Sequence, residues 1–307
     1  MTQALWTRRE VLAMAGAAGG CLLAPGLAAA KDSVMTRPIP ASGESLPVIG
    51  LGTSGVFDVE PTTAELAPRL DILRLMVEHG ASVIDTSPMY GRAEDVSGRV
   101  VEELGVRDRI FYATKVWTRG REAGLAQMED SFRLLRTDTI DLMQVHNLVD
   151  WRTQLASIRD LQEAGRIRYS GITHYQVSEH DALAAVIEAE RPDFVQLNYS
   201  VVTRAAEDRL LPLAADRGVA VIVNRAFEDG RLFQSVRGRT VPGWAVEAGI
   251  DSWGQFFLKY VLAHPAVTCI IPGTSKPKHM RDNLGAGTGP LPDEALRKRM
   301  VSFIESL

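Results

Sequence analysis

Four ionisable side chains, Asp85, Tyr90, Lys115 and His146, lie at or just after the ends of three successive apolar runs. A tyrosine hydroxyl has an ordinary pKa of about 10, so it is a poor acid at neutral pH. A neighbouring lysine ammonium lowers that pKa, and a carboxylate keeps the lysine charged and in place. A histidine can donate a hydrogen bond to a carbonyl oxygen and orient it. The set suits protonation of an oxygen on which negative charge develops as a hydride arrives.

The elements that must position these groups alternate along the chain. The strand-like runs are Val48–Thr53, Ser82–Thr86, Ile110–Val116, Ile140–His146, Ile167–Thr173, Phe194–Tyr199, Ala220–Asn224 and Thr268–Pro272. The helix-like segments are Leu66–Glu78, Val96–Leu104, Gly124–Leu135, Gln154–Glu163, Ala182–Glu190, Glu207–Asp216 and Trp253–Ala263. Nearly continuous apolar runs are typical of strands buried on both faces. Eight strand–helix units predict an α/β fold, a (β/α)8 TIM barrel, whose strand ends converge on one mouth.

Three further segments complete the predicted domain, which covers residues 31–307. Met35–Pro47 holds a turn at Gly43 and is expected to form an N-terminal hairpin that plugs the bottom of the barrel. Phe227–Ile250 is a long insertion after the seventh strand, and insertions of this kind are often functional. Pro292–Ser306 is typical of a C-terminal helix. The chain continues only briefly beyond it, so we expect no long C-terminal substrate loop and an open pocket.

The glycines of Gly50–Gly55 form a G-x-G-x-x-G pattern, which in other folds marks a dinucleotide-binding turn. Such a turn leads directly into a helix, whereas here Val56–Pro61 intervenes. We therefore interpret these glycines as a tight turn at a strand end.

The N-terminus has the features of a twin-arginine signal peptide over residues 1–30. Arg8 and Arg9 precede an uncharged run rich in alanine and glycine, which ends in Ala28-Ala29-Ala30. The composition makes the run a poor membrane anchor. We expect cleavage, export to the periplasm by the twin-arginine machinery, and a mature protein that is not embedded in the membrane.

Composition excludes several classes of protein. The chain has 34 basic and 38 acidic residues, and without Arg8, Arg9 and Glu10 the counts become 32 and 37, a net charge of −5. No basic block remains, which argues against a nucleic-acid partner. Cys269 is then the only cysteine left, so the mature domain cannot form an internal disulfide.

The sequence motifs resemble those of the aldo-keto reductase family. Asp85-x-x-x-x-Tyr90-Gly91, Thr114-Lys115 and Val145-His146 are similar to its catalytic tetrad in order, spacing and strand placement. Four later runs are also similar: Gly171–His174, Val195–Tyr199, Ile271–Ser275 and Arg281–Asn283. The resemblance covers about Val48 to Asn283. It implies that Tyr90 is the general acid and Lys115 its pKa tuner, that Asp85 holds Lys115, and that His146 orients the substrate carbonyl.

The resemblance also implies a nicotinamide cofactor, bound extended across the barrel mouth. Gln196 is expected to contact the nicotinamide amide, while Lys276, Lys278 and Arg281 suit the 2′-phosphate of NADPH. The expected cofactor-binding residues are Thr173, His174, Gln196, Asn224, Arg225, Thr274, Ser275, Lys276, Asp282 and Asn283. Trp117 and Trp151 are expected to line the substrate pocket, and no metal site is expected.

Three positions depart from the family's pattern. His174 stands where the family usually has an asparagine that contacts the carboxamide. Asn224 replaces an aromatic residue that stacks on the nicotinamide ring, and His279 replaces an arginine that often contacts the 2′-phosphate. These changes affect the cofactor site and leave the tetrad intact.

The sequence therefore predicts a monomeric, NADPH-dependent reductase of a small aldehyde or ketone. The alternatives are a non-catalytic cofactor-binding or redox-sensing protein on the same barrel, and a barrel isomerase or lyase that uses the same residues without hydride transfer. Because twin-arginine export carries folded proteins, we expect the cofactor to be bound before export.

Overall fold

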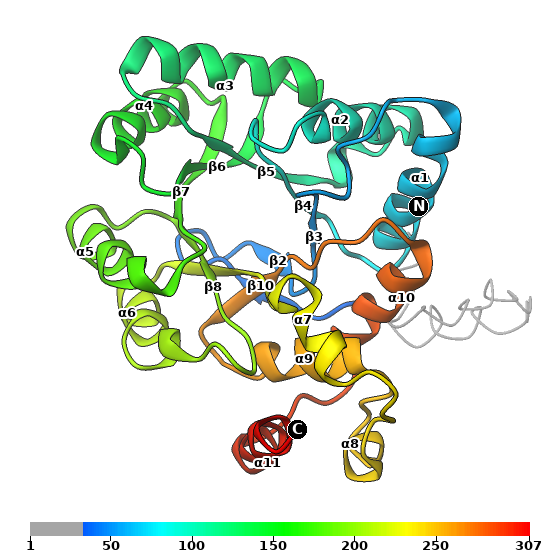
Figure 1. Cartoon of the computed structure of the whole chain (residues 1–307). Helices are drawn as coiled ribbons and strands as arrows, with labels where there is room; N and C mark the ends of the chain where they lie inside the picture. The colour runs from blue at the N-terminus through cyan, green and yellow to red at the C-terminus, as the bar shows by residue number, and fades with distance from the viewer. Residues whose placement is uncertain (1–32) are drawn as a thin grey trace, which may run out of the picture. The chain divides into compact units, whose positions relative to one another are not determined.

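The protein is an eight-stranded parallel barrel surrounded by helices (Figure 1). The strands of the barrel are β3 (Leu51–Gly52), β4 (Val83–Asp85), β5 (Phe111–Val116), β6 (Ile140–His146), β7 (Ile167–Thr173), β8 (Phe194–Asn198), β9 (Ala220–Asn224) and β10 (Val267–Ile270). They lie in sequence order, and parallel bridges from Ile49 to Ile270 and from Gly52 to Gly273 join the first strand to the last. The predicted (β/α)8 fold is confirmed.

The helices lie between and after the strands. They are α1 (Thr63–Glu78), α2 (Ala93–Leu104), α3 (Arg121–Leu135), α4 (Trp151–Glu163), α5 (His180–Glu190), α6 (Leu210–Arg217), α7 (Arg231–Ser235), α8 (Gly243–Glu247), α9 (Trp253–Leu262), α10 (Pro277–Ala286) and α11 (Glu294–Glu305). Short 3₁₀ helices are η1 (Arg107–Arg109), η2 (Val177–Glu179), η3 (Ala205–Glu207) and η4 (Glu228–Gly230). The predicted C-terminal helix is α11.

The computed structural model describes residues 33–307. The segment 1–30, predicted to be a twin-arginine signal peptide, lies outside the described residues. Within residues 33–307, no helix has both the length and the apolar composition that crossing a bilayer requires.

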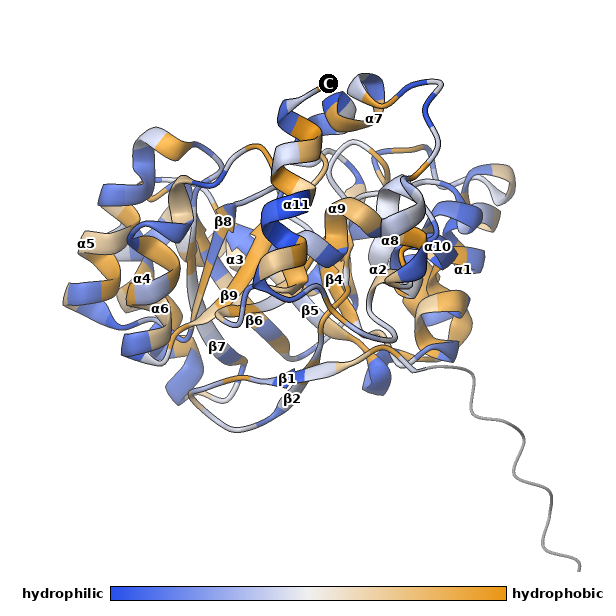
Figure 2. Cartoon of the chain, turned by 90° about the horizontal axis from the view of Figure 1, so that it is seen from below, coloured by the Kyte–Doolittle hydropathy of each residue, from blue (hydrophilic) through white to orange (hydrophobic). Residues whose placement is uncertain are grey.

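The predicted N-terminal hairpin is present and closes one end of the barrel. Its strands, β1 (Thr36–Pro38) and β2 (Ser45–Pro47), pair antiparallel and lie across that end (Figure 2). Ile39 and Leu46 are buried with apolar side chains from inside the barrel. The hydroxyl of Tyr169, on β7, donates to Ser42 Oγ at 2.7 Å in the hairpin turn. The plug thus supplies both apolar cover and a polar anchor.

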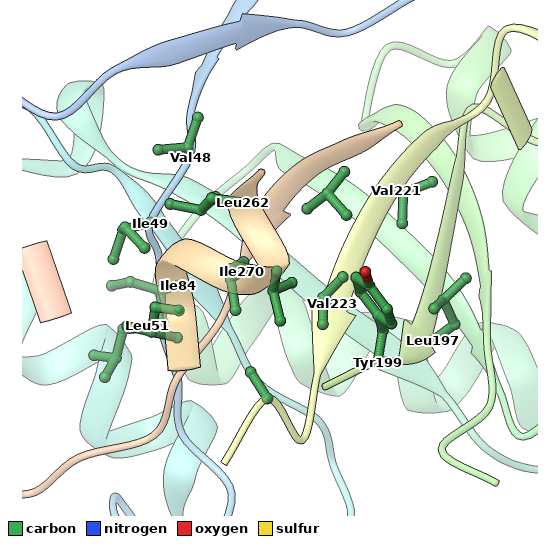
Figure 3. Packing of buried hydrophobic residues seen from close by; sticks show 14 of the residues in the cluster. Val48, Ile49, Leu51, Ile84, Leu197, Tyr199, Val221, Val223, Leu262 and Ile270 are labelled. Carbon is green, nitrogen blue, oxygen red and sulfur yellow. The ribbon is translucent and has the colours of Figure 1, made fainter. Parts of the chain in front are cut away.

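A second and larger apolar layer lies between the barrel wall and the helices. Figure 3 shows part of it, where Leu262 of α9 lies close to Val48 and Ile270. Because both faces of each strand are buried, the strands carry branched apolar residues almost without interruption. Lys115 on β5 and Gln144 on β6 are polar residues that interrupt these runs where the site forms, whereas Arg168 on β7 forms an ion pair with Glu44 of the hairpin.

Several helix boundaries differ from those predicted. The segment expected as one helix over Glu207–Asp216 is a 3₁₀ turn followed by α6, which starts at Leu210 and places Pro212 in its first turn, where proline is tolerated. The insertion after the seventh strand contains η4, α7 and α8 rather than an extended loop. Helix α10, after β10, was not predicted, because its sequence combines charged residues and glycine with little apolar periodicity.

The glycines of the G-x-G-x-x-G pattern serve barrel closure. A Cβ atom at Gly52 would lie 2.6 Å from the carbonyl oxygen of Ile271, so only glycine allows the first and last strands to approach. No helix follows directly, since α1 begins at Thr63. The structure agrees with the interpretation of this pattern as a strand-end turn.

Candidate active site

The barrel brings the four candidate catalytic residues to its carboxyl end. Asp85 ends β4, Lys115 is the last residue but one of β5, and His146 ends β6. Tyr90 follows β4 in the loop that leads to α2. Adjacent parallel strands in register place the ends of β4, β5 and β6 side by side.

Lys115 is fully buried and held by oxygen atoms. Its Nζ donates to Asp85 Oδ1 at 2.6 Å and to the carbonyl oxygen of Thr86 at 2.7 Å. Burial by itself lowers the pKa of Lys115, but the charge of Asp85 opposes it and the net pKa is raised. A buried charge needs such a partner. Lys115 therefore stays protonated at neutral pH.

Tyr90 lies against this ion pair, with Lys115 Nζ 5.1 Å from the centre of its ring. Burial raises the pKa of the Tyr90 hydroxyl, and Lys115 opposes the rise without reversing it. Lys115 thus lowers the pKa of Tyr90 as expected, but desolvation exceeds the attraction of the ammonium and the net pKa is raised. Tyr90 is protonated, which is the form that a proton donor needs.

His146 is a neutral imidazole at the mouth of the barrel. Its ring is perpendicular to that of Tyr90, with 6.0 Å between the centroids, and Ser87 Oγ lies 3.3 Å from Nδ1. Burial, followed by the charge of Lys115, lowers the pKa of His146 to about 3. A neutral ring fixed by Ser87 can donate a hydrogen bond without changing its charge.

These groups open into a cavity of about 740 Å³. Asp85, Tyr90 and His146 line it, and so does Trp117, whose ring centroid is 6.2 Å from that of His146. Trp151 does not line the cavity. It begins α4, where its ring packs against the core and under the guanidinium of Arg152. Only one of the two tryptophans expected in the substrate pocket is therefore placed there.

The cofactor residues expected near the nicotinamide fall into two groups. Thr173, Gln196, Asn224 and Arg225 line the cavity, whereas His174 does not. The His174 ring stacks on Tyr175 with 5.6 Å between centroids. Arg225 forms an ion pair with Asp229 and lies 5.2 Å from the centre of the Tyr175 ring.

The residues expected at the adenosine half lie on α10 and the loop before it. Thr274 Oγ1 accepts from the backbone N–H of Lys276 at 3.1 Å, and Ser275 between them is half-buried. Asp282 accepts from Ser252 Oγ at 2.8 Å and from Gln255 Nε2 at 3.0 Å, so it ties α10 to the start of α9.

Two observations indicate that the expected cofactor-binding residues can hold a dinucleotide. Asn224 Oδ1 and Asn283 Nδ2, at the two ends of the expected site, are buried without a hydrogen-bond partner. Buried polar atoms are ordinarily paired, so each is suited to a ligand group. Across residues 33–307, none of the cations Lys276, Lys278 and Arg281 has an acidic partner within salt-bridge distance, which leaves positive charge for a phosphate.

Two residues of the site were missed from the sequence. Gln144, in the middle of β6, is fully buried and donates from Nε2 to Asp85 Oδ2 at 3.1 Å. Asn147 lines the cavity beside His146 with a left-handed backbone (φ 52°). A polar residue inside an apolar strand run was a signal for Gln144. Asn147 looked like an ordinary loop residue.

The family model described as "Aldo/keto reductase family" matches residues 48–299. The chain therefore belongs to the aldo-keto reductases. It is 30% identical over 190 residues to the aldo-keto reductase YhdN of Bacillus subtilis, a match that spans 57% of this chain and 56% of that protein. It is 24% identical to an Escherichia coli NADH-specific methylglyoxal reductase, over 87% of this chain and 98% of the relative.

A solved structure shares the architecture. The Klebsiella pneumoniae aldo-keto reductase in complex with NADPH superimposes with a TM-score of 0.75 at 25% identity. The superposition covers 89% of this chain and 95% of that one. Membership of an oxidoreductase family that uses nicotinamide cofactors follows, and carbonyl reduction is the activity that the family indicates.

Proposed function

We propose that this protein reduces an aldehyde or ketone to an alcohol with NADPH, and that Tyr90 is the general acid. The observation that carries the proposal is the meeting of a protonated Tyr90, a buried Lys115–Asp85 pair and a neutral His146 on one cavity. Proton donation by a placed side chain accelerates such reactions by roughly 10²–10⁴-fold.

The residues of the chain have separate parts in the proposed reaction. Bound NADPH supplies the hydride. His146 donates a hydrogen bond to the substrate carbonyl oxygen and orients it, and Tyr90 gives that oxygen a proton. Lys115 stabilises the phenolate that remains, because its ammonium lies against the Tyr90 ring. Asp85 keeps Lys115 charged and fixed.

NADPH is proposed over NADH because of the cations on and before α10. Lys276, Lys278 and Arg281 have no acidic partner among the described residues, and the Klebsiella structure was solved with NADPH. The relative named as NADH-specific shows that this choice varies among similar chains.

The test mixes the purified protein with NADPH and a panel of aldehydes and ketones, and follows the NADPH absorbance. We expect turnover in the wild type and a fall in kcat of about 10²–10⁴-fold in Tyr90→Phe, with NADPH binding unchanged within about twofold. Binding without turnover in the wild type would instead favour a cofactor-binding or redox-sensing protein. Turnover that survives in Tyr90→Phe would remove the assigned acid.

We also propose that the protein is exported by the twin-arginine route with its cofactor already bound. The support is the Arg8-Arg9 pattern ahead of a cofactor-dependent domain, together with a route that carries folded proteins. Substrate turnover in the periplasm then requires that the bound cofactor be regenerated there. Protein isolated from the periplasm should contain a nicotinamide cofactor by mass spectrometry, and its absence would count against loading before export.

A further inference from the structure

The side-chain amide of Gln196 is already occupied inside the protein. Its Nε2 donates to Asp85 Oδ2 at 2.7 Å and lies 3.2 Å from Gln144 Oε1. Its Oε1 accepts from Asn224 Nδ2 at 3.2 Å. A glutamine amide has two N–H donors, and both are used here. Gln196 is only 2% exposed, so its amide is held mainly by these partners within the protein.

The partners of Gln196 explain why its amide nitrogen faces Asp85. Asp85 is a buried carboxylate whose Oδ1 is taken by Lys115, which leaves Oδ2 in need of donors. Gln144, on β6, and Gln196, on β8, supply them. Gly171 on β7 makes room for Gln144, because a Cβ there would lie 2.9 Å from Gln144 Cγ. The amides thus surround the carboxylate that positions Lys115.

Asn224, unlike Gln196, has a side-chain oxygen without a hydrogen-bond partner. It ends β9 and lines the cavity, and its Oδ1 is buried with no hydrogen-bond partner. Its Nδ2 is engaged by Gln196, so the unpaired acceptor is the part of the amide that remains free. The terminal torsion of an asparagine is soft, which allows a small rotation toward a ligand. A ligand with an N–H group would satisfy this atom.

His174, where the family's sequence pattern has an asparagine, supplies no such group. Its Nδ1 accepts from the backbone N–H of Gln176 at 3.3 Å, and its ring, which does not line the cavity, stacks behind Tyr175, which does. An amide is therefore missing at the end of β7 and present at the end of β9. The carboxamide of a nicotinamide carries both a donor N–H₂ and an acceptor oxygen, and matches the free group on Asn224.

We propose that Asn224 holds the nicotinamide carboxamide by accepting its N–H, and that Gln196 is instead a positioning residue that holds Asp85. This inference rests on the proposed function. It reverses the role that sequence resemblance gave to Gln196 and gives Asn224 a role other than ring stacking. The two side chains contact each other, so their effects have to be separated by experiment.

The test compares the binding of NADPH with that of its 3-acetylpyridine analogue, which keeps the carbonyl and replaces the N–H₂ by a methyl group. Calorimetry gives the ratio of the two dissociation constants for each protein. We expect the wild type to prefer NADPH by about tenfold, the effect of one hydrogen bond to a buried acceptor. Asn224→Leu should bring the ratio close to one, and Asn224→Asp, which keeps an acceptor oxygen, should retain the preference.

Gln196→Met is the matched control. It should keep the NADPH preference within about twofold while lowering kcat, because Asp85 loses a hydrogen-bond donor and holds Lys115 less firmly against Tyr90. Unfolding midpoints identify any variant that fails to fold, and Asn224→Asp then serves as the second readout at that position. If the preference for NADPH over the analogue is lost in Gln196→Met and kept in Asn224→Leu, this inference is overturned and the proposed function is not. A wild type without preference would have the same consequence, whereas a wild type that binds no NADPH would overturn the proposed function as well.

Discussion

His146 changes its charge far below neutral pH, and this determines how kcat depends on pH. Burial lowers the pKa of its imidazole to about 3, while burial raises the pKa of the Tyr90 hydroxyl above its ordinary value. The histidine is therefore neutral at every pH above roughly 4, and the tyrosine stays protonated until strongly alkaline pH.

The kcat measured at saturating NADPH and carbonyl substrate should accordingly be flat between about pH 5 and pH 9 if chemistry limits the rate, and should fall only at alkaline pH. A buffer series with constant ionic strength measures it. An inflection close to pH 6.5 would mean that His146 titrates like an exposed histidine in the working enzyme and is not the neutral donor described above.

Asn147 and Leu148 follow His146 with consecutive left-handed backbones, at φ 52° and 54°. A residue with a Cβ and no local hydrogen bonding costs about 1–2 kcal/mol in this region, whereas asparagine and glycine adopt it readily. We expect Asn147→Ala to lower the free energy of unfolding by about 1 kcal/mol and Asn147→Gly to lower it by less. Urea unfolding of the two variants measures the difference. Equal values would show that the backbone at position 147 carries no such strain.

For individual residues, the sequence predicted which side chains form the site better than it predicted their burial and hydrogen-bond partners. Asp85, Lys115 and His146 were found because ionisable groups at the ends of apolar strands need a functional or paired explanation. The effect of Lys115 on the pKa of Tyr90 was predicted, but the larger effect of burial was not, because the degree of burial of a loop residue cannot be derived from spacing. Gln144 and the inward-facing amide of Gln196 depend on which side chains face each other across strands.

Among the contacts that attach the C-terminal helix α11, Arg297 makes a partly buried polar network. Arg297 donates to Tyr199 Oη at 2.6 Å and to Glu207 Oε1 at 2.7 Å, and its guanidinium lies 4.6 Å from the centre of the Tyr260 ring. Tyr260 also donates to Glu207 Oε1 at 3.0 Å. These contacts join α11, η3 and α9, and removal of Arg297 takes the positive charge away from the partly buried Glu207 carboxylate.

We expect Arg297→Met to lower the free energy of unfolding by about 1–3 kcal/mol. Lys298→Met, one position along the same helix, removes only an exposed pair with Glu294 and should cost about 0.5 kcal/mol or less. Denaturant unfolding of both variants compares them directly. Similar losses would show that the buried network does not anchor the helix.

Among the elements, those with strong periodicity were predictable and those in the insertion were not. The ranges of β6, β7 and β9 match the prediction because apolar residues recur along each of these short runs, and in β9 they are nearly continuous. The short helices α7 and α8 span five residues each, too few for a helical pattern to be recognised. Their positions depend on contacts such as that between Trp244 and Phe303 of α11.

For the whole molecule, eight alternating units without a break in composition were enough to predict the barrel. The location in the cell is a property of the whole chain, and the proposed export predicts it. Replacing both Arg8 and Arg9 by lysine should retain the protein in the cytoplasm, whereas the wild type should be found in the periplasmic fraction. Immunoblots of cell fractions measure this, with Arg37→Lys as a control outside the predicted signal. Periplasmic protein in the double variant would exclude the twin-arginine route.

Closure of the barrel also sets an order of events during synthesis. Ile49 pairs with Ile270, and these residues are 221 positions apart (270 − 49). At translation rates of about 5–20 residues per second, the first strand waits roughly 10–40 seconds for its last neighbour. Throughout that time one edge of the nascent sheet is open to other chains. Slow synthesis of the region before β10 would therefore favour aggregation over folding.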